Sequence, residues 1–184
     1  MKKRNVIIYF HGFNSSPNTL KVERLRRRFP NDEVYAFDIP IDPDISIDKL
    51  MSDIDSVLLD KLHIGINLVF VGTSLGAWYA EYMSRLYDAS RYLINPSYNP
   101  SVSLLKYGVD LVIASKYDDM YLFMNAHYYI GTKDEVIDYS PILNKLPHST
   151  KYLEADHAFN GDEFDVVMED IDKEIHRYDG SERL

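Results

Sequence analysis

Short apolar runs alternate along the chain with longer segments in which apolar positions recur every three or four residues. The runs are rich in β-branched and aromatic side chains, as is typical of buried strands, whereas the longer segments are typical of amphipathic helices. We expect strands at Asn5–Phe10, Glu33–Phe37, Asn67–Val71, Arg91–Asn95, Ala126–Ile130 and Thr150–Glu154. We expect helices at Asn18–Phe29, Ser46–Leu62, Leu75–Tyr87 and near Glu163–Tyr178, with Pro17 and Ser46 as start signals. This order predicts an α/β fold with a mostly parallel, six-stranded sheet and helices on both of its faces.

One stretch, residues 96–125, departs from this rhythm. It begins with Pro96 and Pro100 close together and continues into a Tyr- and Met-rich segment. This stretch could be a small cap or an ordinary connection. A chain of 184 residues that is 46% hydrophobic can bury one substantial core. No repeat or linker divides it, so we expect a single domain over residues 1–184.

The composition excludes several classes of function. The sequence contains no cysteine, which rules out a disulfide framework, a Cys-ligated zinc and a thiol nucleophile. A formal net charge of −9 argues against sequence-independent binding of nucleic acid. No run approaches the roughly 18 apolar residues of a membrane span, and Val6–Phe10 is too short for a signal peptide. We therefore expect a soluble, cytoplasmic protein.

The charges are unevenly distributed along the chain. Basic residues are concentrated in the first 28 positions and acidic residues in the last thirty. Such runs are usually solvated helix faces, which is the interpretation we favour. A docking patch for an anionic carrier group is the alternative.

The sequence Gly72-Thr73-Ser74-Leu75-Gly76 matches the G-x-S-x-G pattern of a nucleophile elbow. It directly follows a predicted strand and directly precedes a predicted helix, which is the setting that this sharp turn requires. Gly72 and Gly76 leave space where side chains two positions from the serine would collide. The pattern therefore indicates a strained, exposed Ser74 hydroxyl that acts as a nucleophile. A tight glycine turn around a buried serine is the alternative.

A serine nucleophile needs a base, and the base needs an acid that orients it. In this architecture the chain order is Ser, then Asp or Glu, then His, on loops after later strands. Asp134 and His157 follow the fifth and sixth predicted strands and fit that order. The rivals for the acid are Glu135, Asp138 and Asp156. Asp134 is preferred because it comes earliest in its loop.

The oxyanion of an acyl-transfer intermediate needs two backbone N–H donors. Leu75 begins the helix after the elbow, so its N–H is one candidate. His11-Gly12 ends the first strand and lets the chain turn the N–H of Phe13 toward the site. We expect His11 to brace this loop. The remaining histidines have no position that suits a catalytic base: His63, His127, His148 and His176.

Several segments resemble the bacterial esterases of the UPF0227 family, of the YqiA/YcfP type. The segments that carry the resemblance are Tyr9–Pro17, Gly72–Gly76, Asn95-Pro96, Gly131–Tyr139 and Asp156–Phe159. The resemblance spans nearly the whole chain and implies a compact α/β-hydrolase fold with little or no lid. It also implies esterase or acyl-thioesterase activity with Ser74, Asp134 and His157 as the triad. One departure is Ala77, where the family usually has a second glycine.

These observations predict a serine hydrolase that acts on carboxylic esters or acyl thioesters through an acyl-enzyme, without a metal or organic cofactor. Amide or C–C bond cleavage on the same triad is one alternative, because a fold does not fix its substrate. A non-catalytic binding protein on this fold is the other. Tyr98, Tyr121 and Phe123 could line an acyl pocket, and ordinary core packing explains them equally well. The oligomeric state cannot be read from the sequence.

Overall fold

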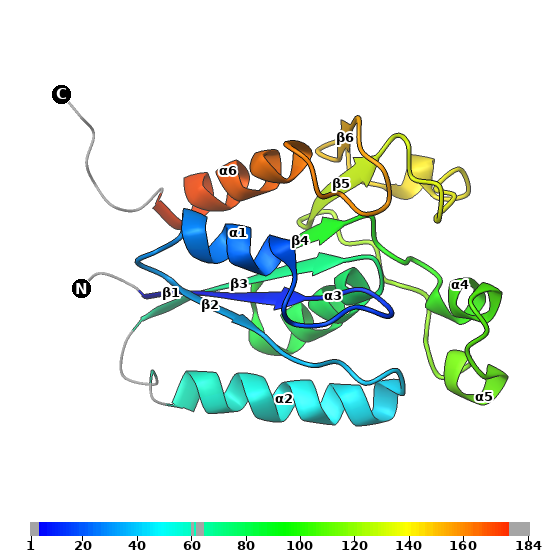
Figure 1. Ribbon diagram of the computed structural model, residues 1–184, viewed down its shortest axis with the longest axis horizontal. Helices are drawn as coiled ribbons and strands as arrows, with labels where there is room; N and C mark the ends of the chain where they lie inside the picture. Colours follow the sequence, from blue (N-terminus) through cyan, green and yellow to red (C-terminus); the bar gives the residue numbers. More distant parts are fainter. Residues whose placement is uncertain (1–3, 60, 62–64, 177–184) are drawn as a thin grey trace.

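The computed structural model describes residues 4–59, 61 and 65–176 of the chain (Figure 1). Its centre is a sheet of six strands in the order β2-β1-β3-β4-β5-β6, and every neighbouring pair is parallel. The strands are β1 (Arg4–Phe10), β2 (Glu33–Ala36), β3 (Ile66–Thr73), β4 (Ser90–Ile94), β5 (His127–Gly131) and β6 (Lys151–Leu153). All six predicted strands are confirmed, and the mostly parallel sheet is wholly parallel in the described residues.

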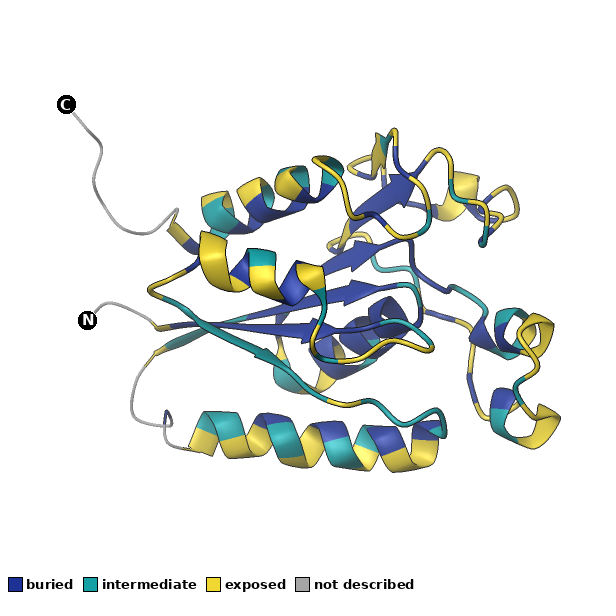
Figure 2. Ribbon diagram, in the orientation of Figure 1, coloured by how far each residue is buried: buried dark blue, intermediate teal, exposed yellow. Residues whose placement is uncertain are grey.

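The helices cover both faces of this sheet (Figure 1). α1 (Leu20–Arg28) and α6 (Glu163–His176) pack on one face, where their apolar side chains form one core cluster with Ile7 and Val69. α2 (Pro43–Leu59) and α3 (Leu75–Tyr87) pack on the other, in a cluster with Ile8 and Phe70. Successive strand residues point to opposite faces, so the two clusters share the central strands. β1 is buried from Asn5 onward, and β3 is buried along its carboxyl-terminal part (Figure 2).

Two of the predicted helix starts are wrong. α1 begins at Leu20, because the Thr19 side chain caps it by accepting from the N–H of Val22, whereas Pro17 lies outside the helix. α2 begins at Pro43, and Ser46 is fully buried in its first turn, where its hydroxyl lies 2.6 Å from the Tyr79 hydroxyl. The predicted ends of the second and last helices lie outside the described residues.

The basic and acidic segments of the sequence meet in the fold. Arg24 on α1 pairs with Asp165 on α6 at 2.7 Å. Arg28, one turn further along α1, pairs with Asp172, also on α6. Both pairs are partly exposed, so each contributes about 0–1 kcal/mol to stability. The two ion pairs join neighbouring faces of α1 and α6.

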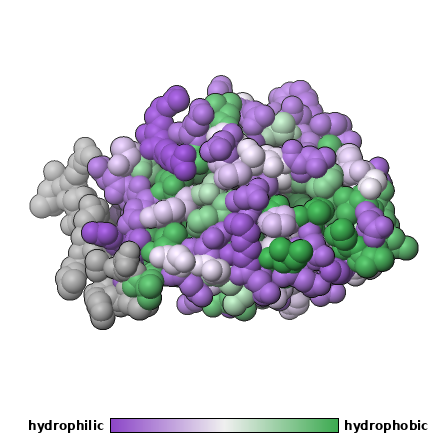
Figure 3. Space-filling view, turned by 60° about the horizontal axis from the view of Figure 1, so that its bottom comes forward, coloured by the Kyte–Doolittle hydropathy of each residue, from purple (hydrophilic) through white to green (hydrophobic). Residues whose placement is uncertain are grey.

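Residues 96–125 contain α4 (Pro100–Lys106) and α5 (Leu111–Ala114), which lie beyond the carboxyl ends of the strands, as Figure 1 shows. Large apolar side chains are exposed along these helices, and hydrophobic side chains gather at this end of the molecule in Figure 3. The exposed residues are Val102, Leu105, Tyr107, Leu111 and Val112. We call this surface the α4–α5 patch.

Among the helices of the described residues, none is long and apolar enough to cross a membrane.

Candidate active site

Ser74 occupies a sharp turn between β3 and α3. Its φ of 57° and ψ of −122° lie in a region that residues other than glycine rarely adopt. Three hydrogen bonds on its own backbone hold this conformation. Its N–H donates to the Ile94 carbonyl at 2.9 Å, and its carbonyl accepts from the N–H groups of Ala77 at 3.0 Å and Ser97 at 3.1 Å. A strained backbone of this kind costs on the order of 1–3 kcal/mol and persists only where the surrounding structure enforces it.

The two glycines of the motif are required by close backbone packing. A Cβ at Gly72 would overlap the carbonyl oxygen of Gly76 and the backbone of Ala77. A Cβ at Gly76 would overlap the carbonyl oxygens of Phe10 and His11. Gly72 therefore lets α3 turn back over β3, as predicted, whereas Gly76 lets the helix approach the end of β1. The Ala77 methyl group is fully buried without disturbing this turn.

The structure brings Ser74, His157 and Asp134 into one hydrogen-bonded line. The Ser74 Oγ lies 3.0 Å from Nε2 of His157. On the other side of the ring, Nδ1 lies 2.9 Å from Oδ2 and 3.0 Å from Oδ1 of Asp134. With its proton on Nδ1, the imidazole donates a hydrogen bond to the carboxylate, and its Nε2 accepts one from the serine O–H. The Asp134 side chain is 2% exposed and that of His157 is 18% exposed, so the imidazole is reachable and the carboxylate is shielded.

Backbone groups orient the Asp134 carboxylate independently of the histidine. Its Oδ1 accepts from the N–H groups of Val136 and Ile137 at 2.8 and 2.9 Å, which closes an Asx turn after β5. The three rivals for the acid have other partners. Glu135 accepts from the His157 N–H, Asp138 from the Ser140 N–H, and Asp156 from the Phe159 N–H.

Phe13 and Leu75, the predicted oxyanion donors, lie beside Ser74 and line the same pocket. A Cβ at Gly12 would lie 3.2 Å from Cβ of Ser74, so the loop after β1 runs directly against Ser74. Leu75 is the first residue of the 13-residue helix α3, whose N-terminal dipole points its positive end toward this position. His11 is buried, and its Nδ1 lies 2.9 Å from the Gly12 carbonyl, in keeping with a bracing role for this loop.

The pocket that contains Ser74 and His157 has a volume of about 250 Å³. Its walls are mostly apolar, and they include Leu104, Tyr107, Val136 and Ile137. Tyr107 is the aromatic residue that segment 96–125 contributes, and it connects the pocket to the α4–α5 patch.

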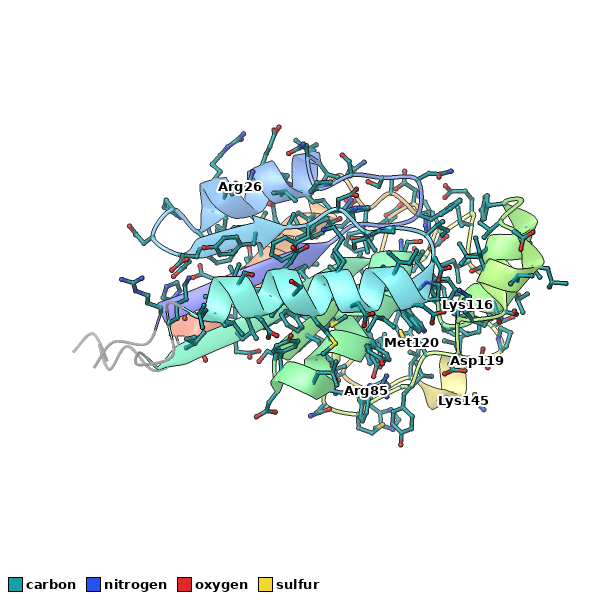
Figure 4. The ribbon with its side chains drawn as sticks, turned by 90° about the horizontal axis from the view of Figure 1, so that it is seen from below. Arg26, Arg85, Lys116, Asp119, Met120 and Lys145 are labelled. Carbon is teal, nitrogen blue, oxygen red and sulfur yellow. The ribbon has the colours of Figure 1, made fainter. Side chains whose placement is uncertain are left out.

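The structure does not bring the three aromatic candidates for an acyl pocket to Ser74. Tyr98 and Tyr121 line a separate pocket of about 490 Å³, together with Asp119, Met120 and Lys145. Figure 4 shows Asp119, Met120 and Lys145 near one another, at the lower right of the view. Phe123 instead packs against the Arg91 guanidinium, 4.5 Å from its ring centroid. A Tyr-rich composition does not reveal which wall a loop presents.

Asn95 is a positioning residue that the sequence reasoning did not single out. It is fully buried, has a φ of 41°, and follows the last residue of β4. Its Oδ1 accepts from the Gly131 N–H at 2.7 Å, and its Nδ2 donates to the carbonyls of Asp156 and His157 at 2.9 and 3.2 Å. One side chain therefore ties the loop that carries the base to the end of the strand that precedes the acid. A polar residue at a strand end directly before a proline was the available signal.

The loop after His157 is also held from α1. Lys21 donates to the carbonyl of Ala158 and, at 2.8 Å, to Oδ1 of Asn160. Burial lowers the pKa of this lysine to about 8, and the nearby Glu163 carboxylate opposes that shift. Arg24 donates to the carbonyls of Asn160 and Gly161, so the first helix fixes the loop through two cationic side chains.

The parallel sheet, the elbow after its third strand and the hydrogen-bonded Ser, His and Asp residues define the α/β-hydrolase fold. Solved structures with this fold are similar to the chain. Est1E from Butyrivibrio proteoclasticus has a TM-score of 0.68 at 13% identity, covering 98% of this chain and 90% of its own. An esterase from Pyrococcus furiosus also has a TM-score of 0.68, at 14% identity, covering 95% and 81%. A protein described as a hydrolase of the alpha/beta superfamily, from Xanthomonas campestris pv. campestris, has a TM-score of 0.63 at 14% identity, covering 94% and 99%.

The chain belongs to the uncharacterised protein family UPF0227, whose sequence model matches residues 6–131. This match confirms the family resemblance and includes the elbow serine and the loop after β1. It ends before Asp134 and His157, so the geometry of those two residues is evidence of a separate kind.

Proposed function

We propose that this protein is a serine hydrolase that cleaves carboxylic esters or acyl thioesters. The observation that carries the proposal is the line of hydrogen bonds from Ser74 through His157 to Asp134, set on a strained elbow. A binding protein on this fold would have no need of a strained serine that is hydrogen-bonded to an oriented base. The apolar pocket and the adjoining α4–α5 patch favour an acyl group as the part of the substrate that is bound.

The proposed reaction proceeds in two acyl transfers. His157 takes the Ser74 proton at Nε2 while the serine oxygen attacks the carbonyl carbon, and Asp134 stabilises the imidazolium that forms. The N–H groups of Phe13 and Leu75 stabilise the oxyanion of the tetrahedral intermediate. As the C–O or C–S bond breaks, the imidazolium gives its proton to the departing alcohol or thiol. Water then loses a proton to His157 and attacks the acyl carbon. The bond from that carbon to the Ser74 oxygen breaks, the imidazolium returns its proton to the serine, and the carboxylic acid is released.

The first experiment is labelling with a fluorophosphonate, followed by mass spectrometry of the labelled peptide. We expect the probe to modify Ser74, because the reaction requires the activated hydroxyl and the oxyanion donors. Folded protein that remains unlabelled would refute the proposal and favour a binding role.

The second experiment is hydrolysis of p-nitrophenyl esters from acetate to palmitate. We expect Ser74→Ala and His157→Ala each to lower kcat by about 10⁴-fold or more, as loss of a triad member can. His148→Ala is the matched control, because this histidine is exposed and lies outside the pocket. Activity that survives in the Ser74 variant would show that the hydrolysis has another origin.

A further inference from the structure

The acyl pocket contains polar groups that the proposed reaction does not use, and two of them form a hydrogen-bonded pair of hydroxyl groups. Ser97 and Ser103 both line the pocket, and their Oγ atoms lie 2.8 Å apart. Ser97 is 3% exposed, and its backbone N–H donates to the Ser74 carbonyl at 3.1 Å. The pair therefore lies close to Ser74, in a pocket whose walls are mostly apolar.

The hydrogen bonds of this pair leave capacity for a ligand. Two hydroxyl groups supply two donors and four lone pairs, and the bond between them uses one of each. The second donor has a weak partner in the protein, because the Ser103 Oγ lies 3.4 Å from the Pro100 carbonyl, beyond the usual O–H···O range of about 2.5–3.0 Å. A ligand hydroxyl can donate a hydrogen bond to one of the free lone pairs. It can also accept a hydrogen bond from the hydroxyl that has only this weak partner. A hydrocarbon chain would leave both unmet, at a free-energy cost.

The size of the pocket limits the group that it can hold. An apolar cavity of about 150 Å³ binds benzene, so the volume of about 250 Å³ fits on the order of ten non-hydrogen atoms. We propose that the natural acyl group is a short, hydroxyl-bearing one, whose hydroxyl binds the Ser97–Ser103 pair. This inference rests on the proposed function and names the substrate class of the same site. Discrimination by a hydrogen-bonding site is typically stronger than discrimination by a methylene group.

The test compares p-nitrophenyl esters in matched pairs, butyrate against 3-hydroxybutyrate and hexanoate against 3-hydroxyhexanoate. For each enzyme the measured quantity is the ratio of kcat/KM for the hydroxy ester to kcat/KM for the plain ester. We expect the wild-type ratio to exceed about 10. In Ser97→Ala and in Ser103→Ala we expect the ratio to fall at least five-fold, because about one hydrogen bond to the substrate is lost.

Ser101→Ala is the matched control, because Ser101 lies on the same helix as Ser103 and outside the pocket lining. Its ratio should equal that of the wild type. If Ser97→Ala fails to fold, Ser103→Ala carries the test, because Ser103 is only partly buried on the short surface helix α4.

A wild-type ratio near or below 1, in protein whose Ser74 is labelled by a fluorophosphonate, would overturn the substrate class and leave the hydrolase proposal intact. A high ratio that survives in both serine variants would overturn the role of the pair. Failure to label Ser74 would overturn the hydrolase proposal, and this inference with it.

Discussion

Replacing Asn95 should disconnect the base from the acid. In Asn95→Ala the Gly131 N–H and the carbonyls of Asp156 and His157 lose their side-chain partner. A buried polar group left unpaired costs about 1–3 kcal/mol, and an alanine at a φ of 41° adds about 1 kcal/mol. The sum, about 3–6 kcal/mol after allowing for partial relaxation, is a large part of the 5–15 kcal/mol by which domains are usually stable.

Asn95→Asp is the sharper variant, because it keeps the shape of the side chain and the acceptor for Gly131. It replaces the NH₂ donor with a carboxylate oxygen that faces two carbonyl oxygens. The repulsion should push the His157 loop outward. We expect kcat for ester hydrolysis to fall by about 10²-fold, the typical effect of a displacement of about 1 Å at a catalytic group, with a smaller change in KM.

The assay combines urea unfolding, followed by circular dichroism, with steady-state kinetics on the folded enzyme. Asn5→Ala is the control, because it removes one side-chain hydrogen bond to Asp32 at the opposite end of β1. It should lower the unfolding midpoint and leave kcat unchanged. Wild-type kcat in Asn95→Asp would refute the view that this amide positions the base.

Three further variants test other parts of the structure. Burial raises the pKa of Glu81 to about 7 from 4.5, with Arg85 and Arg91 opposing the shift. The unfolded chain therefore releases this proton first, so the free energy of unfolding should fall by up to about 3 kcal/mol between pH 4.5 and 7. Urea midpoints at pH 5 and 7.5 should show a smaller fall in Glu81→Gln, and equal falls would contradict this origin. Gly76→Ala should destabilise the fold by more than about 3 kcal/mol, because its methyl group would overlap the end of β1; a wild-type melting temperature would contradict that packing. Leu104→Trp should fill the pocket and shift ester preference toward shorter acyl chains, and an unchanged chain-length profile would place the acyl group elsewhere.

The sequence was informative where a structural feature is local. The strand runs, the third helix and the elbow follow from hydrophobic period and from two glycines, and the structure reproduces them within a residue or two. Asp134 and His157 were reachable because parallel strands bring their following loops to one edge of the sheet. Helix starts were less predictable. Thr19 caps α1, whereas the stronger start signal in the sequence was Pro17, which lies before the helix begins.

The features that were missed depend on the meeting of distant segments. Asn95 bonds to residues 36 and about 60 positions away, and no local pattern announces such contacts. The Ser97–Ser103 pair exists because the connection after β4 folds back over the pocket as α4. The same fold explains why Tyr107 reaches the site while Tyr121 does not. Composition reports which side chains are present, and only the path of the chain decides which wall they form.

The candidate site joins one strained residue to two loops, one anchored by its own backbone and the other by distant parts of the chain. Ser74 is held by backbone hydrogen bonds with Ile94, Ala77 and Ser97. Asp134 is held by the N–H groups that follow it, and the His157 loop by Asn95 and Lys21. Because the acid is anchored without help from the histidine, movement of the base is the main way in which this alignment can fail. The His157 loop should therefore control activity more strongly than the elbow or the Asp134 turn, since it depends on contacts with the most distant parts of the chain.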